Sequence, residues 1–348
     1  MEVKPFIQTR TGNYSSRKFN ALIDVRKDAL SVIRRHLEIN GFTEVLTAVL
    51  VNIAGSCENP YASFKLPYYG KDVHLSQSAQ LQLEKLVVSL DRKVFTVNNS
   101  FREENFDDPD AAGRRLSEFT LIEPEMPLAD NNDENNLISL TKLVTTIIKE
   151  VLRQQLDNNE QLLVQLGADI DHLHLCLEMN FRTVDYHEAI DIIRSLTGKY
   201  HSLKDGISVK EEKLLLKHFE RLPFFIINFP HDQKLFNIKR RPGSDCTYTF
   251  DLIMPQLGEA VGGGLREENP DIILSQLHQS KVGKFLHDHN GQPEEVFEEY
   301  FNALQQQANC PRGGFGIGFE RLIGFLINSN DILHTISYRS FVPGKPLG

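Results

Sequence analysis

The acidic residues Asp251 and Glu259 lie in a segment that is predicted to form a β-hairpin around Pro255. Antiparallel pairing about that proline sets the two carboxylates opposite one another, where like charges destabilise a sheet. A cation between them removes this penalty, and hard oxygen ligands suit Mg²⁺. Since magnesium held by two carboxylates usually arrives with phosphate groups, the hairpin favours a nucleotide-dependent enzyme. The alternative is a solvated acidic turn whose carboxylates point apart.

Three arginines stand where they could bind the phosphates of a nucleotide. Arg102 ends a predicted strand, and Arg321 lies in the first turn of a predicted helix, where a guanidinium suits a phosphate. Arg266 follows a glycine run at 262–264, whose missing side chains let a substrate approach the backbone closely. Each arginine taken alone is more typical of a surface ion pair.

The usual phosphate-binding loops are not present in the sequence. A P-loop needs GxxxxGK[ST], but the Gly-Lys pair at 344–345 precedes a proline and not a hydroxyl residue. The glycines of 314–318 do not follow GxGxxG, and no βαβ unit surrounds them. A nucleotide would therefore have to be held by side chains on an antiparallel sheet.

Periodic patterns predict the elements that position these residues. Helices are expected over 24–39, the end of 75–90, 137–155, 186–197, 269–308 and 319–327, and strands over 42–51, 94–104, 114–126, 223–230, 235–240 and 313–318. Residues 1–16 are expected to form an N-terminal arm, and residues 157–220 a small helical insertion within a domain spanning 17–348. The order of elements predicts an α+β fold with a mostly antiparallel sheet flanked by helices, because it lacks the alternation of a doubly wound fold.

Composition narrows the class of protein. The 348 residues, 41% of them apolar, suffice for one large domain or two ordinary ones. A net charge of −9 argues against a protein that coats nucleic acid, so no DNA partner is expected. Four scattered cysteines predict neither a zinc site nor a disulfide framework. Because no signal peptide or membrane-spanning apolar run is found, we expect a cytoplasmic protein with no membrane partner.

Four segments, in order and at fitting separations, resemble the catalytic domain of the class II aminoacyl-tRNA synthetases, specifically the aspartyl/asparaginyl subgroup. They are motif 1 at 41–47, motif 2 at 101–119, the metal and substrate hairpin at 250–267, and motif 3 at 314–322. The resemblance implies the class II catalytic fold for residues 17–348. It also implies an AMP-forming ligase with ATP and Mg²⁺ as cofactors, and a homodimer formed through motif 1.

The resemblance implies roles in ATP binding for residues of motifs 2 and 3. Arg102 would bind the α-phosphate and the amino-acid carboxylate, and Arg321 would hold the γ-phosphate. Glu104 would read the adenine amino group, and Phe119 would stack on adenine. Arg115, where the family has a histidine, would add positive charge near the phosphates.

The hairpin carboxylates complete this set. Asp251 and Glu259 would carry Mg²⁺, and Glu259 would also contribute to ATP binding. Activation would be the in-line attack of a substrate carboxylate on the α-phosphorus. Catalysis would come mainly from positioning and from neutralisation of charge.

The amino-acid pocket leans towards asparagine. Aspartyl enzymes carry a lysine that takes the side-chain carboxylate, but here Leu83 stands at that position and Glu84 matches the asparaginyl pattern. A glutamate accepts a hydrogen bond from an amide but repels a carboxylate, whereas Arg266 could donate to either ligand. Glu84 could instead be a solvated helix residue. The predicted substrate-binding residues are Glu58, Gln80, Glu84, Gly263 and Arg266.

The chain also departs from the family in features that concern tRNA. Few residues precede motif 1, so no anticodon-binding OB barrel is expected. Ala48 replaces the motif 1 proline, and Leu265 replaces a polar residue before Arg266. The motif 2 loop at 106–110 contains three aspartates, which would repel a phosphate backbone.

We therefore expect a paralogue that activates asparagine, aspartate or a close analogue and passes the acyl group to ammonia or another small nucleophile, with tRNA a disfavoured partner. One alternative is a truncated asparaginyl-tRNA synthetase-like enzyme that charges tRNA or a carrier. The other is a non-catalytic sensor of an amino acid or nucleotide, although a sensor need not keep the full set of residues for ATP and Mg²⁺.

Overall fold

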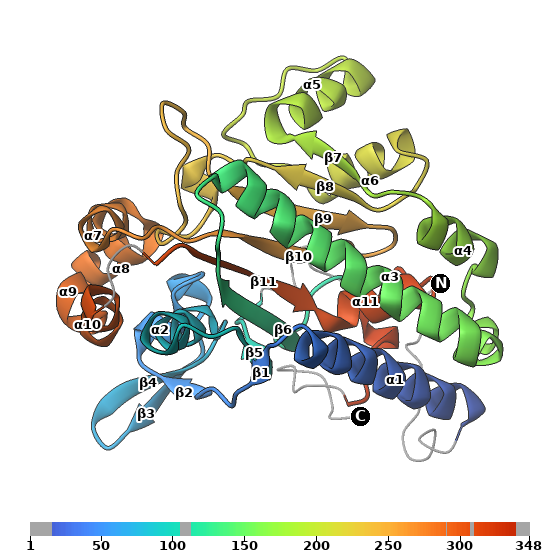
Figure 1. The fold of residues 1–348 in the computed structure, drawn as a ribbon, viewed down its shortest axis with the longest axis horizontal. Helices are drawn as coiled ribbons and strands as arrows, with labels where there is room; N and C mark the ends of the chain where they lie inside the picture. The colour runs from blue at the N-terminus through green and yellow to red at the C-terminus, as the bar shows by residue number, and fades with distance from the viewer. Residues whose placement is uncertain (1–15, 105–112, 290, 307–309, 339–348) are drawn as a thin grey trace.

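The structure, a computed structural model, describes residues 16–104, 113–289, 291–306 and 310–338, so nearly all of the predicted N-terminal arm lies outside it. The described chain forms an eight-stranded sheet, a three-stranded sheet and helices that pack around them (Figure 1). This architecture confirms the expected α+β fold. None of the described helices is both long enough and apolar enough to cross a membrane.

The large sheet has the strand order β1-β5-β6-β11-β10-β9-β8-β7. Its strands are β1 (Thr43–Glu44), β5 (Val94–Phe101), β6 (Glu118–Pro127), β7 (Arg182–Asp185), β8 (Phe224–Ile227), β9 (Thr249–Met254), β10 (Gly258–Leu265) and β11 (Arg312–Gly318). Neighbours are antiparallel except in the described pairs β1–β5 and β7–β8. The last of these strands in sequence, β11, lies between β6 and β10 in the middle of the sheet.

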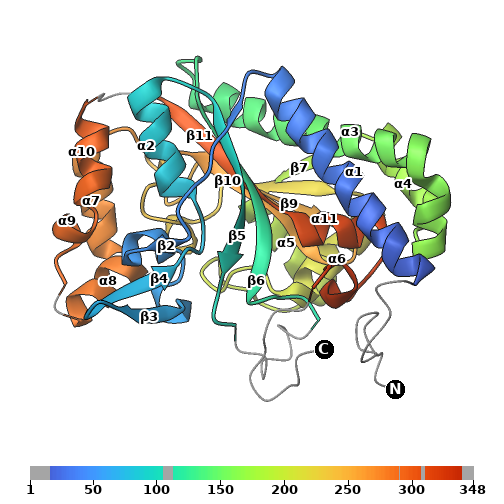
Figure 2. The same cartoon turned by 90° about the horizontal axis from the view of Figure 1, so that it is seen from below.

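The small sheet has the order β2-β4-β3 and stands beside the end of the large one (Figure 2). Its strands are β2 (Leu50–Val51), β3 (Lys65–Tyr68) and β4 (Lys71–Leu75). The segment 42–51 therefore does not form the single strand that its sequence predicts, because β1 and β2 belong to different sheets. The segment 235–240 is not a strand either, since only isolated bridges pair Ile238 with Arg266 and Arg240 with Thr247.

Two long helices, α1 (Arg17–Ile39) and α3 (Asp133–Leu166), cover one face of the large sheet (Figures 1 and 2). Apolar side chains of both helices join those of the central strands in the largest core cluster. The other helices are α2 (Gln80–Leu90), α4 (Ile170–Glu178), α5 (Tyr186–Thr197), α6 (Val209–His218), α7 (Pro270–Gln279), α8 (Lys281–Asp288), α9 (Pro293–Val296), α10 (Glu298–Gln306) and α11 (Phe319–Leu326).

The two long helices extend beyond their predicted ends. α1 begins seven residues early because the Ser16 side chain accepts a hydrogen bond from the backbone of the first turn. α3 begins four residues early because Asn132 caps it in the same way, and the acidic Asp133 suits the positive end of the helix dipole. α3 also continues to Leu166. The segment 157–220, which was expected to be an insertion, thus supplies the end of α3 and also β7, which lengthens the large sheet.

Candidate functional site

The central strands of the large sheet have one apolar face and one polar face, because successive side chains point to opposite sides. On β6, Ile122 and Met126 join the core under α1 and α3, while Glu123 and Glu125 point the other way. On β9, the same alternation separates Leu252 from Asp251. Glycines of β10 and β11 also alternate with core residues, so that several of them lie on the polar face. The polar face therefore has carboxylates with glycines between them, which leaves space for a ligand.

The hairpin of β9 and β10 brings the two predicted metal ligands together, but in another register. Asp251 pairs with Gly262, and Glu259 pairs with Ile253. The predicted pairing of Asp251 with Glu259 is wrong because the turn centres on Gln256, and a bulge after Glu259 shifts the register by one residue more. The carboxylates still converge: a Cβ added to Gly262 would lie 3.2 Å from both Asp251 Oδ1 and Glu259 Oε1.

A lysine that the sequence analysis missed holds one of these carboxylates. Lys234 Nζ lies 2.8 Å from both Asp251 Oδ1 and Asp251 Oδ2, and 3.8 Å from the centre of the Phe229 ring. Burial raises the pKa of Asp251 to about 7, although the Lys234 ammonium acts in the opposite direction. An ammonium thus neutralises Asp251 in the protein alone.

The two hairpin carboxylates fit a magnesium ion that brings its own further ligands. No cluster of three or more metal-binding side chains occurs in the described ranges. Magnesium is commonly held by one or two carboxylates together with phosphates and water. The space beside Gly262, between two carboxylate oxygens, suits such an ion better than it suits a metal held by protein side chains alone.

The guanidinium of Arg102 lies over the ring of Phe119, and both residues are predicted to bind ATP. The Arg102 guanidinium carbon is 5.2 Å from the centre of the Phe119 ring. Its Nη2 also pairs with the carboxylate of Glu58, which the sequence predicts as a substrate-binding residue. Its Nε is buried without a hydrogen-bond partner in the described part of the chain. An anionic ligand would satisfy that donor.

Arg321 stands beside the hairpin carboxylates. Its Nη1 donates to the backbone oxygen of Glu259 and lies 3.9 Å from Glu259 Oε2. Burial lowers the pKa of Arg321, the carboxylates of Glu259 and Glu212 act to raise it, and the positive charges of Arg114 and Arg102 act to lower it. Three guanidinium groups thus share one region, and such an arrangement favours a polyanionic ligand.

Glu104 and Arg115 flank the motif 2 loop. Arg115 Nη1 lies 3.1 Å from Glu104 Oε2, so the two predicted ATP contacts pair with each other. The loop between them, 105–112, lies outside the described residues, and so does its predicted acidic surface.

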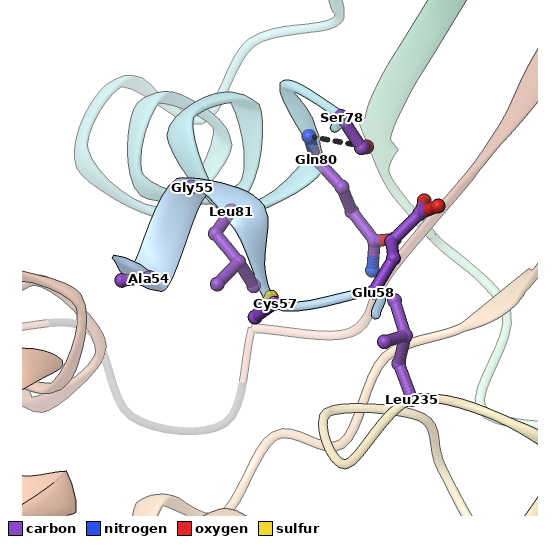
Figure 3. A pocket seen from close by; sticks show the side chains of 8 residues that line it. All are labelled: Ala54, Gly55, Cys57, Glu58, Ser78, Gln80, Leu81 and Leu235. Carbon is purple, nitrogen blue, oxygen red and sulfur yellow. Dashed lines mark hydrogen bonds between the residues drawn. The ribbon is translucent and has the colours of Figure 1, made fainter. Parts of the chain in front are cut away.

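A small pocket opens beside this region (Figure 3). It has a volume of about 10 Å³, enough for about one water molecule. Its polar lining comes from Glu58, Ser78 and Gln80. Behind Ser78 lies Glu123, which accepts hydrogen bonds from Ser78 Oγ and from the Ala79 backbone. Burial raises the pKa of Glu123 to about 7, while these hydrogen bonds act to lower it.

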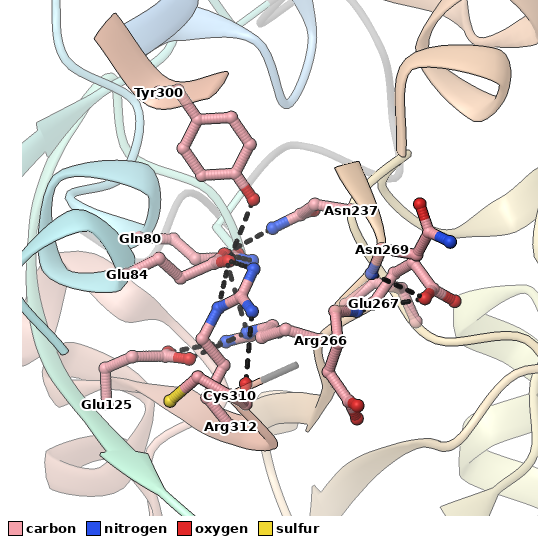
Figure 4. Close-up of polar contacts among 12 residues, drawn as sticks. Gln80, Glu84, Glu125, Asn237, Arg266, Glu267, Asn269, Tyr300, Cys310 and Arg312 are labelled. Atoms are coloured by element: carbon pink, nitrogen blue, oxygen red, sulfur yellow. Dashed lines mark hydrogen bonds and ion pairs between the residues drawn. The ribbon is translucent and has the colours of Figure 1, made fainter. Parts of the chain in front are cut away.

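A buried group of charges, which we call the Glu84 cluster, adjoins the pocket (Figure 4). Its members come from six different segments and are Glu84, Glu125, Asn237, Arg266, Tyr300 and Arg312. Glu84 Oε2 accepts from Arg312 Nε at 3.1 Å and Nη2 at 3.0 Å, and from the Tyr300 hydroxyl at 2.9 Å. Glu84 Oε1 accepts from Asn237 Nδ2, and from Gln80 Nε2 at 3.1 Å. Glu84 is therefore a buried, paired residue and not a solvated one.

Arg266 forms the other ion pair of the cluster. Its Nε and Nη2 donate to the two oxygens of Glu125 at 3.0 and 2.9 Å. Burial raises the pKa of Glu125 to about 7, while Arg266 acts to lower it. Gly263, also predicted to bind substrate, faces the core instead, because a Cβ there would lie 2.5 Å from Phe315 Cβ.

The sequence analysis missed Lys234, Glu123, Glu125, Tyr300, Asn237 and Arg312 as residues of this site. Local patterns give a signal for only some of them. Glu123 and Glu125 alternate with apolar residues along a strand, so the sequence does indicate that both leave the core. The pairing of Glu84 with Arg312 joins positions 228 residues apart, and no spacing within the sequence indicates it.

Comparisons with known proteins identify the family. The family model described as tRNA synthetases class II (D, K and N) matches residues 6–340. An asparagine–tRNA ligase of Phytoplasma australiense is 28% identical over 362 residues, which cover 96% of this chain and 73% of the relative. The mitochondrial asparagine–tRNA ligase of Saccharomyces cerevisiae is 26% identical, with 94% and 69% covered.

Solved structures are similar over the same extent. The asparaginyl-tRNA synthetase of Pyrococcus horikoshii, crystallised with asparaginyl-adenylate, superposes with a TM-score of 0.81 at 26% identity, covering 97% of this chain and 71% of that one. The Entamoeba histolytica asparaginyl-tRNA synthetase has a TM-score of 0.76 at 28% identity, with 94% and 68% covered.

Proposed function

Since this chain belongs to the class II tRNA synthetases of the D, K and N group, and is thus an ATP-dependent ligase of that type, we propose that it activates asparagine, aspartate or a close analogue as an aminoacyl adenylate. The observation that carries this proposal is the meeting of Arg102, Phe119 and Arg321 with the Asp251 and Glu259 carboxylates on one face of the sheet. Cations, an aromatic ring and a carboxylate pair together match the parts of ATP.

ATP would lie across the central strands on the polar face. Adenine would stack on Phe119, with Glu104 accepting from its amino group, and the phosphates would meet Arg102 and Arg321. Asp251 and Glu259 would hold Mg²⁺, which when bound neutralises phosphate charge. Arg115, released from Glu104, would add a further cation near the phosphates.

The amino acid would bind between Arg102 and the small pocket. Its ammonium group suits the side chains of Glu58, Ser78 and Gln80, and its carboxylate would lie against Arg102. A carboxylate oxygen would attack the α-phosphorus of ATP, the bond to the bridging oxygen would break, and pyrophosphate would leave. The acyl group would then remain bound to AMP through the newly formed bond.

We propose ammonia or another small amine as the acyl acceptor. Attack of the amine nitrogen on the acyl carbon would form an amide and release AMP. Electrostatics support this choice, because the chain carries a net charge of −9 and three aspartates in the segment 105–112, which oppose a phosphate backbone. The similarity to asparagine–tRNA ligases supports the second candidate acceptor, tRNA.

Exchange of labelled pyrophosphate into ATP tests the activation step. We expect exchange that depends on asparagine or aspartate and that is lost in Arg102→Ala. If the wild-type protein supports no exchange with any amino acid, adenylation is refuted, and a sensor of amino acid or nucleotide becomes the better description. Binding of ATP by calorimetry without exchange would identify such a sensor.

A second assay distinguishes the acceptors. The enzyme is given ATP and its amino acid with ammonia, with hydroxylamine or with total tRNA, and the products are identified by mass spectrometry. Formation of an amide or hydroxamate without tRNA charging supports the small acceptor. Charging of tRNA in the same reaction conditions, with no amide formed from ammonia, contradicts it.

We also propose that motif 1 forms a homodimer interface. Leu46, at the end of this motif, is 94% exposed in the single chain, and Ile39 nearby is 78% exposed. Ala48 departs from the family proline, and its backbone N–H donates to Gln82 Oε1 at 2.8 Å, a bond that proline could not make. Sedimentation velocity should show a dimer that Leu46→Asp converts to a monomer, whereas a monomeric wild type would contradict the proposal.

A further inference from the structure

Glu84 is the residue that the sequence analysis expects to discriminate between a substrate amide and a substrate carboxylate. It is completely buried, and Arg312, 1% exposed, binds one of its oxygens with two nitrogens. A buried carboxylate without such a partner is strongly disfavoured. We propose that Arg312 sets the substrate class, an inference that rests on the proposed amino-acid activation. By neutralising Glu84, Arg312 makes the amino-acid pocket accept a side chain that ends in a carboxylate.

The first step in this argument is that Glu84 has no acceptor left for a substrate amide. A carboxylate has about four lone-pair sites. Glu84 Oε2 receives three donor atoms, from Arg312 and Tyr300, and Oε1 receives two, from Asn237 and Gln80. All five are side-chain atoms of the protein. An amide NH₂ of a substrate would have to displace one of them.

The second step is that the cluster still offers a donor. Arg266 uses Nε and Nη2 for Glu125 and lies 3.7 Å from Glu84 Oε1. Its third nitrogen, Nη1, donates to no acceptor among the described residues. Gln80 lines the pocket and also donates to Glu84, so the cluster adjoins the proposed amino-acid site. A carboxylate oxygen there could accept from Arg266 Nη1.

The third step is the balance of charge. Glu84 and Glu125 are opposed by Arg266 and Arg312, so the cluster is neutral with Arg312 and would carry one negative charge without it. A net negative pocket repels a carboxylate and tolerates an amide, whereas a neutral one that offers a guanidinium N–H attracts a carboxylate. Burial also raises the pKa of Glu125 to about 7, which shifts the balance further towards positive charge.

The test compares pyrophosphate exchange with aspartate and with asparagine in the wild-type protein, in Arg312→Gln and in Arg312→Lys. The wild type should have a kcat/KM for aspartate at least equal to that for asparagine. Arg312→Gln should lower the aspartate-to-asparagine ratio by about tenfold or more, and Arg312→Lys, which keeps the charge, should restore it. A purely structural role would lower both substrates alike and leave the ratio unchanged.

A second variant protects the test against misfolding of Arg312→Gln. In Glu84→Gln/Arg312→Gln both charges are removed, so no buried carboxylate lacks a partner, and the ratio should return towards that of the wild type. Exchange with asparagine that exceeds exchange with aspartate tenfold in the wild type would overturn this inference alone. Exchange with neither amino acid would instead overturn the proposed activation itself.

Discussion

The two halves of the site treat charge in opposite ways. Around Arg321 and the hairpin, Asp251 is buried and paired with Lys234, but Glu259 is paired loosely: it is 3.9 Å from Arg321 and has 46% of its side chain exposed. In the Glu84 cluster every charge is buried and has a partner of opposite sign within about 3 Å. The first half leaves charge for a ligand to neutralise, whereas the second is neutral before any ligand arrives. On the proposed function, binding of ATP would depend on charge that the ligand neutralises, and selection of the amino acid on charge that the protein neutralises.

Substitution of two glycines by alanine, one in each half of the site, should give the largest difference in stability. A Cβ at Gly314 would lie 2.0 Å from Glu125 Oε2 and 2.4 Å from the Pro124 backbone oxygen. Gly314→Ala should therefore cost about 4 kcal/mol or more of stability, measured by chemical denaturation. Gly262→Ala meets only movable carboxylate ends at 3.2 Å and should stay folded with a raised KM for MgATP. Equal stability losses in the two variants would contradict the contrast.

The second-largest expected effect is a loss of pyrophosphate exchange in a variant that stays folded. Arg102→Ala removes a cation from a part-exposed position, so stability should change little, whereas pyrophosphate exchange should fall about 10³-fold. Arg115→Ala is the matched control, since Arg115 is an arginine of the same motif that pairs with Glu104 near the surface. Its effect on exchange should be much smaller. Similar losses for both arginines would show that motif 2 acts only through its total charge.

The smallest expected effect is a dependence on pH. The pKa of Asp251 is raised from 3.8 to about 7, so the folded state binds this proton more tightly than the unfolded state. The associated stability is fully present below pH 4 and is lost as the pH rises through 7. Binding of MgATP requires the ionised carboxylate of Asp251. The affinity for MgATP should therefore rise with pH, so that it is about tenfold lower at pH 6 than at pH 8.

Asp251→Asn is the control for this pH dependence. It keeps the shape of the side chain and removes the titrating proton, so that both the stability profile and the KM profile for MgATP should become flatter between pH 6 and pH 8. An unchanged KM profile in this variant would assign the effect to another group, such as Glu123, whose pKa also lies at about 7.

Local patterns predicted the elements that carry strong periodicity. The helix at 186–197, the strand at 313–318 and the hairpin around 255 all follow from alternation or from turn residues. The β3 strand did not, because all four of its residues are exposed and no alternation marks it. The hairpin register also escaped prediction, since a bulge depends on how neighbouring strands pack and not on the two segments alone.

The residues of the site also divide into those that the sequence predicts and those that it does not. Arg102, Phe119 and the hairpin carboxylates come together as the sequence motifs imply, because each motif spans a strand end or a turn. Glu84 and Arg266 were predicted as substrate-binding residues, but the ion pairs of the Glu84 cluster could not be foreseen, since they connect α2, β6, α10 and the start of β11. The ion pair with Arg312 changes the prediction for Glu84. A lone glutamate at this position favours a substrate amide, whereas Glu84 is part of a neutral pair.

The position of β11 has a consequence for how the chain reaches its native state. This strand, which begins at Arg312, separates β6 from β10, so two half-sheets stay unjoined until β11 pairs between them. Until then both half-sheets expose an unpaired edge, a state prone to wrong association. Because Arg312 lies in β11 and Arg321 in the helix after it, both halves of the site depend on this closure. Refolding should accordingly be slow and limited by this long-range closure.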